Sequence, residues 1–356
     1  MTQARALRSA SFFTFKVADF LRSVTIKDIA LAAGVSIKTV SRVLNREPYV
    51  RDTIRERVWQ LVEQFEYQPH PAARSLGGRR TYSIGLILEV PETYSYVKRL
   101  IDGVFDVCET RRYSLLLRPG HEALKAAEVK KYVRQTRVDG VILPAPIGDS
   151  EEVTRTLTEM EVPFAQLSPR NIRADWMSAR PNDEAACREL LHEIYALGHR
   201  RVGFIKGLRG HGSTVRRLQG YWDSVNELGF DIDPNLVVDG AFDFESGHAG
   251  AMALLNLQEP PTVIVASNDD MAHGAIVAAR ERNLSVPNDL SVVGFDDSPV
   301  AKQTFPSLTT MRQPIYEMAQ ALTNMLLDKL HGLDIQEKVR EYSCELIRRD
   351  SLKALA

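Results

Sequence analysis

Short apolar runs alternate with longer amphipathic segments from residue 83 almost to the end of the chain. The runs are mostly apolar, which is typical of strands buried on both faces, as in parallel sheets covered by helices. The predicted strands are 83–88, 114–117, 140–143, 163–167, 201–205, 262–266 and 290–295. The segments between them repeat apolar residues at helical spacing. These predicted helices include 97–110, 183–197, 214–228 and 270–282.

This alternating stretch is too long for one sheet, so the sequence predicts two similar α/β lobes, each a doubly wound parallel sheet. We expect the break between them near 180–182. A late helix at 315–331 can cross back to the first lobe.

A different, wholly helical pattern precedes the strands. Thr25 followed by Asp28 resembles a capping box, which begins a helix, and Gly34 is expected to end that helix. Ser36 can cap a second helix, and an apolar stripe from 54 to 65 predicts a third. Three short helices with a glycine turn between the first two predict a helix-turn-helix unit.

Charge is unevenly distributed between these two parts. Residues 1–80 carry 14 Lys and Arg against 7 Asp and Glu (net +7), whereas the remainder carries 31 against 39 (net −8). A basic amino-terminal module suggests a polyanionic partner, although a chance imbalance of surface charge gives the same numbers. The three cysteines form no CxxC pair, and no apolar run reaches the roughly 20 residues of a membrane helix. We therefore expect a cytoplasmic protein with no disulfide, membrane partner, cofactor or metal.

The second predicted helix, within "VSIKTVSRVLN" (35–45), has a distinctive polar face. Arg42 can donate two hydrogen bonds to guanine, Lys38 can donate to guanine or phosphate, and Ile37 can contact a thymine methyl. Other polar groups nearby suit phosphate oxygens, which fix the register of a protein on DNA. These predicted phosphate contacts are Thr25, Ser36, Thr39, Ser41, Asn45 and Tyr67. A solvated helix face is the alternative, and the basic charge and the three-helix pattern weigh against it.

At these residues the chain resembles the LacI/GalR family of bacterial transcription repressors. The stretches "VTIKDIALAAGVSIKTVSRVLN" and "YQPHPAARSL" are similar to the family's amino-terminal signature, and "ASNDDMAHGAI" and "VPNDLSVVGFDDS" to its regulatory core. The resemblance implies a homodimer bound to a near-palindromic operator in double-stranded DNA. It also implies that Ile37, Lys38 and Arg42 read bases, and that Leu76 wedges into the minor groove at the operator centre.

Domain boundaries follow from these patterns. Residues 1–23 are expected to be a disordered arm or a misassigned start, 24–70 the helix-turn-helix domain and 71–80 a hinge helix or linker. Residues 81–356 are expected to form the effector-binding and dimerisation core. Its first lobe is predicted at about 81–181 and 313–341, and its second at about 182–312 and 342–356.

The two-lobed core resembles periplasmic sugar-binding proteins, and ligands of open α/β sheets bind at the carboxyl ends of strands. Asn268 and Asp296 lie just beyond predicted strands and suit sugar hydroxyls. Ser213 and Arg217 are four residues apart, hence on one face of a helix. Phe242 can cover one face of the ligand.

The family resemblance implies that these five residues contact a small-molecule effector, and it adds Tyr96 and Val97 at the edge of the pocket. Val97 stands where the family often has an aromatic residue. Structural roles are the alternatives: Asn268 can cap the helix that follows it, Asp296 can stabilise a turn, and Phe242 can pack in the core.

An enzyme is not predicted, because the sequence shows no converging set of catalytic groups. "GLRGHG" (207–212) lacks the glycine order of a nucleotide loop. If one helix carried both His192 and His199, two turns would separate them by about 10 Å, too far to share a metal ion. The sequence predicts a ligand-responsive, sequence-specific transcription regulator, most simply a repressor of carbohydrate-utilisation genes. A sugar receptor with a vestigial DNA-binding module is the alternative; salt-sensitive, sequence-specific binding of a palindromic duplex distinguishes the two.

Overall fold

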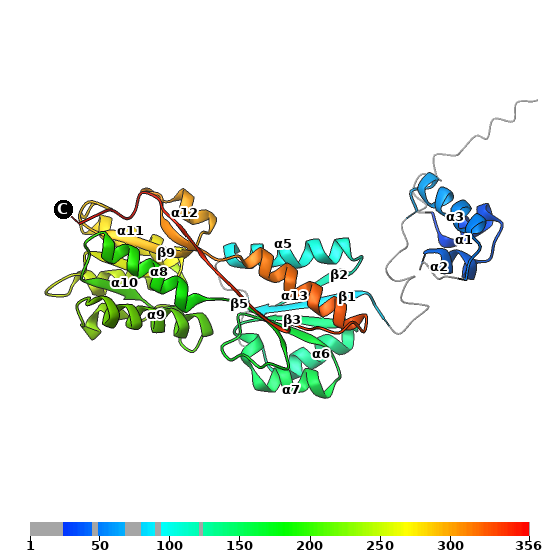
Figure 1. The fold of residues 1–356 in the computed structure, drawn as a ribbon, viewed down its shortest axis with the longest axis horizontal. Helices are drawn as coiled ribbons and strands as arrows, with labels where there is room; N and C mark the ends of the chain where they lie inside the picture. Colours follow the sequence, from blue (N-terminus) through cyan, green and yellow to red (C-terminus); the bar gives the residue numbers. More distant parts are fainter. Residues whose placement is uncertain (1–23, 45–48, 68–79, 90–93, 121–123, 356) are drawn as a thin grey trace, which may run out of the picture. The chain divides into compact units, whose positions relative to one another are not determined.

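The computed structural model describes residues 24–44, 49–67, 80–89, 94–120 and 124–355 (Figure 1). The chain divides into two compact units, Met1–Gly78 and Arg79–Ala356. The predicted arm at 1–23, Asn45, and Leu76 with most of its hinge lie outside the described residues. Within the part of the chain that is described, no helix has the length and apolar character needed to cross a membrane.

The first unit packs three short helices around an apolar core. Helix α1 (Ile26–Ala33) begins at the predicted capping pair, where the Thr25 backbone N–H and hydroxyl donate to the Asp28 carboxylate at 2.8 and 2.6 Å. Gly34 follows with a φ of 65°, a left-handed conformation that glycine adopts without strain. Helices α2 (Ile37–Leu44) and α3 (Asp52–Gln64) complete the unit. Its core includes Ile29, Val40, Val43, Val58 and Val62.

The second unit contains two lobes, each built on a six-stranded sheet. The first lobe has the strand order β11-β5-β4-β3-β1-β2, and its neighbouring strands are parallel. Its strands are β1 (Ser83–Glu89), β2 (Ser114–Gly120), β3 (Gly140–Pro144), β4 (Phe164–Leu167), β5 (Met177–Pro181) and β11 (Val339–Tyr342). One apolar cluster joins the sheet to α5 (Tyr94–Thr110) and α13 (Ile315–Leu330). A second cluster joins its other face to α6 (Ala126–Thr136) and α7 (Glu151–Glu159) (Figure 1).

The second lobe repeats this plan with the order β12-β10-β9-β8-β6-β7. Its strands are β6 (Val202–Ile205), β7 (Val237–Val238), β8 (Val263–Ala266), β9 (Ser291–Asp296), β10 (Thr309–Arg312) and β12 (Glu345–Ile347). Only the β10–β12 pair is antiparallel among the described pairs. Helices α8 (Asp183–Ala196) and α9 (Gly212–Leu228) cover one face, and α10 (Phe244–Leu255) and α11 (Asp269–Glu281) the other. The short α12 (Pro299–Gln303) follows β9.

The chain passes between the lobes three times. Residues 180–182 lead from β5 in the first sheet to α8 on the second, and α13 carries the chain from β10 back to the first sheet. After β11 the chain returns to the second sheet as β12. The fold class predicted from the sequence is confirmed: a helical amino-terminal unit precedes two α/β lobes with mainly parallel sheets.

The strands that the apolar pattern did not predict are short or polar. β10 reads "TTMR" and β11 reads "VREY", so neither contains an apolar run. β7 has only two residues, and both β7 and β11 lie at sheet edges. A search for continuous apolar runs therefore misses β10, which is buried but consists largely of threonine, and the edge strands β7 and β11.

Candidate functional site

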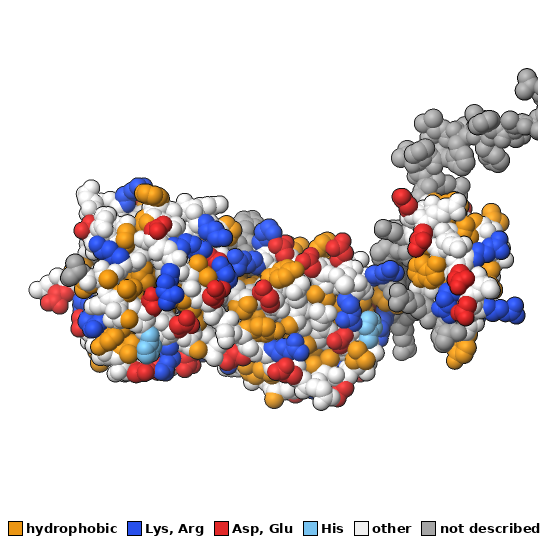
Figure 2. Space-filling view, turned by 45° about the horizontal axis from the view of Figure 1, so that its top comes forward, with side chains coloured by type: hydrophobic (Ala, Val, Ile, Leu, Met, Phe, Trp, Pro, Cys, Tyr) orange, Lys and Arg blue, Asp and Glu red, His pale blue; other side chains and the backbone are white. Residues whose placement is uncertain are grey.

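Helix α2 exposes the side chains that the sequence predicted for base contacts. Ile37 is 45% exposed, and Lys38 and Arg42 are also exposed, whereas Val40 and Val43 are completely buried. One face of the helix therefore packs in the unit and the opposite face is available to a major groove. Lys and Arg side chains project from this unit in Figure 2.

The residues predicted to contact phosphates differ in burial and in the hydrogen bonds that their hydroxyls make within the protein. The Ser36 hydroxyl accepts from the Thr39 backbone N–H at 3.1 Å and lies 2.9 Å from the Thr39 hydroxyl, so it caps the amino end of α2 as predicted. Ser41 is half-buried on the same helix. Tyr67 is only 7% exposed and packs in the core of the unit, and this burial raises the pKa of Tyr67. Its ring therefore stabilises the unit, and a phosphate contact would involve its hydroxyl alone.

A cavity of about 310 Å³ lies between the two lobes of the second unit. Its walls come from segments at the carboxyl ends of parallel strands in both sheets, the position at which open α/β sheets bind ligands. The structure brings together at this cavity every residue predicted to contact an effector. These residues are Tyr96, Val97, Ser213, Arg217, Phe242, Asn268 and Asp296.

Arg217 is held in the cavity wall by a buried ion pair. Its Nε donates to the Asp183 carboxylate at 2.8 Å, and its guanidinium also donates to the Ser267 carbonyl and lies 3.6 Å from the centre of the Phe295 ring. Asp183 is fully buried and Arg217 is 3% exposed. Asp183 accepts a further hydrogen bond from Arg216 at 2.8 Å. The single negative charge of Asp183 is thus shared between the guanidinium groups of Arg216 and Arg217.

Asn268 has the structural role given as its alternative, and it also lines the cavity. Its side-chain oxygen accepts from the Met271 backbone N–H at 2.9 Å, which caps α11, while its amide donates to the Phe242 carbonyl at 2.8 Å. Phe242 has a φ of 67° and its ring lies over Gly207, where a Cβ atom would be 2.0 Å from the ring. The two proposed roles of Phe242, core packing and cavity wall, are therefore compatible.

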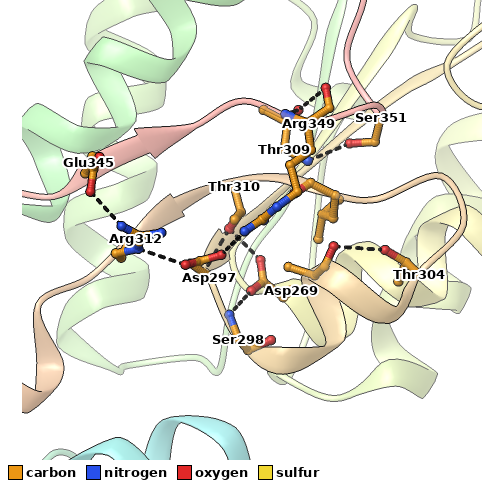
Figure 3. Close-up of polar contacts among 12 residues, drawn as sticks. Asp269, Asp297, Ser298, Thr304, Thr309, Thr310, Arg312, Glu345, Arg349 and Ser351 are labelled. Carbon is orange, nitrogen blue, oxygen red and sulfur yellow. Dashed lines mark hydrogen bonds and ion pairs between the residues drawn. The ribbon is translucent and has the colours of Figure 1, made fainter.

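The two neighbouring acids of "FDDS" have different surroundings. Asp296 faces the cavity and accepts a hydrogen bond from Gln313. Burial raises the pKa of Asp296 to about 7, although Arg217 opposes the shift. Asp297 instead points at Arg312 and Arg349 (Figure 3). Burial raises the pKa of Asp297, but the hydrogen bonds from these arginines outweigh it and leave that pKa below its usual value.

Asp269 links the turn after β9 to the neighbouring strand β10. Its carboxylate accepts from the Ser298 backbone N–H at 2.6 Å and from the Thr310 hydroxyl at 2.5 Å (Figure 3). Burial and the nearby charge of Asp296 raise the pKa of Asp269 well above its usual value. Asp269 and Asp297 thus stabilise the turn after β9, and Asp296 is left facing the cavity.

The sequence did not identify several polar residues of the cavity. His211 lies two residues before Ser213, and its Nδ1 is 2.8 Å from the Ser213 hydroxyl. Burial and the positive charge of Arg217 lower the pKa of His211 to about 4, so its ring is neutral at physiological pH. Burial raises the pKa of Asp270 to about 6. Gln313 follows β10, which no apolar run marks, whereas His211 could have been found from its closeness to Ser213 in the chain. The remaining polar wall residues not identified are Ser168 and Ser298.

The chain is similar to known proteins over almost its full length. Residues 25–70 match the family model of bacterial regulatory proteins of the lacI family, and 191–352 match the periplasmic binding protein-like domain. The HTH-type transcriptional regulator AscG of Escherichia coli (strain K12) is 32% identical over 332 residues, which cover 93% of this chain and 98% of AscG.

Two solved structures share the fold. The lac repressor dimer bound to operator and the anti-inducer ONPF is 26% identical with a TM-score of 0.77, covering 93% of this chain and 99% of that one. The transcriptional regulator CelR in complex with cellobiose is 27% identical with a TM-score of 0.71, covering 92% and 99%.

Proposed function

Because the chain belongs to the lacI family of bacterial regulatory proteins, we propose that it controls carbohydrate-utilisation genes in response to an uncharged sugar or sugar derivative. Regulators of this family bind operator DNA and small-molecule effectors as dimers. The chain is accordingly a DNA-binding transcriptional repressor under effector control, and its relatives are regulators rather than enzymes. DNA binding agrees with the cytoplasmic location expected from the cysteines.

The composition of the cavity wall is the observation that supports a neutral, hydroxylated effector. Carboxylates at Asp270 and Asp296, the amide of Gln313 and the hydroxyl of Ser213 offer acceptors and donors to vicinal hydroxyls. Arg217 is the only Lys or Arg among the described wall residues, and it is paired with Asp183, which also pairs with Arg216. His211 is neutral at physiological pH. An acidic ligand would therefore meet two carboxyl groups and a single guanidinium group that already has an ionic partner.

We place the operator contacts on paired copies of the first unit. Each copy inserts α2 into the major groove of a half-site, with Ile37, Lys38 and Arg42 reading bases. Leu76 is the proposed wedge at the operator centre, where an apolar side chain can open a base step. Effector binding between the lobes must favour one dimer arrangement over the other, because a ligand that binds both equally well shifts nothing.

Selection of preferred duplexes from a random pool tests this function. We expect a near-palindromic consensus, binding that weakens steeply with salt, and a change in operator affinity when a neutral sugar is added. Thermal-shift screening of sugars identifies the effector to use. Equal binding to all duplexes, whatever their sequence, would contradict the proposal.

Arg42→Ala should weaken binding to the selected operator by about 1–3 kcal/mol and relax base preference at one position of each half-site. The reason is the loss of the two hydrogen bonds that a guanidinium donates to guanine. Competition binding against single-position operator variants measures both effects. Arg57→Ala, an exposed cation on α3, is the matched control for charge, and should leave base preference unchanged. If preference persists at every position in Arg42→Ala, Arg42 has no part in base readout.

A further inference from the structure

Arg99 and Arg216 cross between the two lobes in opposite directions, and neither belongs to the described wall of the cavity. Arg99 on α5 of the first lobe donates to the backbone carbonyl of Asp297 in the second lobe at 2.7 Å. Arg216 on α9 of the second lobe donates to the backbone carbonyl of Pro169 in the first at 3.1 Å. Hydrogen bonds from a charged donor are the stronger kind, so each arginine ties one lobe to the other.

The second lobe holds its end of each contact in a fixed position. Arg216 is oriented by two hydrogen bonds to the buried Asp183 carboxylate, at 3.0 and 2.8 Å. The Asp297 carboxylate accepts from two arginines of its own lobe, which fixes the turn whose carbonyl receives Arg99 (Figure 3). Because the Arg216 guanidinium and the Asp297 carbonyl are fixed in this way, both contacts depend on the spacing of the lobes.

The backbones of the two lobes also approach each other closely beside Arg216. A Cβ atom at Gly212, the first residue of α9, would lie 2.7 Å from the Cα atom of Arg170 in the first lobe. A larger residue at position 212 would not permit this approach. Arg170 is itself fixed, because its backbone N–H donates to the Asp149 carboxylate at 2.6 Å. The lobes therefore lie against each other at this point.

We propose that the hydrogen bonds of Arg99 and Arg216 form an interlobe latch, which sets the fraction of molecules whose lobes are closed around the cavity. A ligand that contacts both lobes binds to this closed fraction, so its apparent affinity rises and falls with that fraction. Arg99 is therefore a positioning residue, which raises ligand affinity without lining the cavity. The latch follows from contacts within the two-lobed core and does not rest on the chemistry of the effector.

Distances between two spin labels on the full chain test the latch without a ligand. The labels are attached through Arg155→Cys on α7 of the first lobe and Asn226→Cys on α9 of the second, both at exposed positions. Labelled subunits are mixed with an excess of unlabelled ones, so that a labelled dimer carries one pair. Arg99→Met should add a second label distance that is absent in the wild type, because part of the population opens.

Lys98→Met is the matched control for the distance measurement. Lys98 precedes Arg99 on α5, but it is 72% exposed and pairs with Asp102 on its own helix. This substitution should leave the label distance unchanged. If the distance distribution of Arg99→Met also equals that of the wild type, Arg99 does not hold the lobes and the proposal is overturned.

Gly212→Ala opens the lobes by a different route. The added methyl group would overlap the backbone of Arg170, so the lobes must move apart although both arginines are present. We expect the same second label distance as in Arg99→Met, and an unfolding midpoint in urea close to that of the wild type, since the core of each lobe is unchanged. A wild-type distance distribution in folded Gly212→Ala would show that closure does not need this contact and would overturn the latch.

Calorimetry with glucose, galactose, mannose and ribose measures the consequence for binding. A sugar that binds the wild type should bind Arg99→Met about five- to tenfold more weakly, a modest loss because the Arg99 side chain is 33% exposed and water competes for it. Its affinity for Lys98→Met should be unchanged. Equal affinity for Arg99→Met and the wild type overturns the role of the latch in binding. If none of the four sugars binds, the label distances decide the latch on their own, so its failure and that of the proposed effector class are distinguishable.

Discussion

Asp183→Asn is expected to lower the free energy of unfolding of the second unit by about 3–5 kcal/mol, the cost of removing one partner from a buried ion pair. Asp183 is fully buried at the start of α8 and accepts from both Arg216 and Arg217. An amide of the same shape leaves two guanidinium groups facing one neutral oxygen, with little water to solvate Arg217. Urea unfolding followed by circular dichroism measures the loss.

Glu193→Gln is the matched control on the same helix. Glu193 also accepts two hydrogen bonds from an arginine, at 2.7 and 2.9 Å from Arg348, but the Arg348 side chain is 64% exposed. Because water and salt screen this pair, its loss should cost less than about 1 kcal/mol. If the free energy of unfolding falls by the same small amount in both variants, the buried ion pair of Asp183 contributes no more to stability than the exposed pair of Glu193.

Asp183→Asn also tests the charge balance of the cavity. In Asp183→Asn the guanidinium of Arg217 loses its ionic partner, so the ligand preference of the cavity should move toward acids. We expect a sugar acid to bind more tightly to the folded variant than to the wild type, and a neutral sugar to bind no better. Asp183 thereby links the stability of the second lobe to the proposed choice of an uncharged effector.

Some of these features could be predicted from the sequence because they are periodic. The exposed face of α2 follows from the positions of Val40 and Val43 on a helix of 3.6 residues per turn. The convergence of Asn268 and Asp296 on one cavity follows because the carboxyl ends of neighbouring parallel strands lie at the same edge of a sheet. Both features can be predicted without knowing which distant parts of the chain contact each other.

Other features depend on contacts between distant parts of the chain and left no local signal. Asp183 looks like an ordinary first-turn acid of a helix, and nothing near it indicates pairing with Arg217. Gln313 follows a polar strand whose place in the sheet is set by its neighbours β9 and β12. The division of roles between Asp296 and Asp297 depends on Arg312 and Arg349, which lie in and just after β10 and β12, two strands that pair with each other.

Asp296→Asn is expected to weaken effector binding by about 3 kcal/mol, roughly a hundredfold, because sugar hydroxyls donate more strongly to a carboxylate than to an amide. Operator binding without effector should remain, since Asp296 lies in the second unit and α2 in the first. Calorimetry with the identified effector and competition binding with the selected operator measure the two properties separately. An intact effector response in Asp296→Asn would place the ligand elsewhere.

The pH dependence provides a second, independent measurement on this variant. Because the pKa of Asp296 is raised to about 7, the free cavity holds a largely protonated carboxyl at pH 6 and a carboxylate at pH 8. Hydroxyl donors favour the carboxylate, so effector affinity of the wild type should rise from pH 6 to pH 8, and affinity of Asp296→Asn should rise much less. Asp270, with a pKa of about 6, also lines the cavity, so its titration affects mainly the lower part of this range.

Stability should change with pH in the opposite direction. A carboxyl whose pKa is higher in the folded than in the unfolded chain binds protons more strongly when folded, so its contribution to stability is lost as pH rises from about 4 to about 7. Asp296→Asn removes this loss of stability. The unfolding temperature of the variant minus that of the wild type should therefore be larger at pH 8 than at pH 5. Asp289→Asn, a substitution at an exposed acid of the same lobe, is the control and should show no such difference. Both pH effects together would show that the Asp296 carboxylate destabilises the folded protein at pH 8 and is stabilised when ligand hydroxyls donate to it, as expected of a binding site. The absence of both effects would mean that Asp296 serves packing alone.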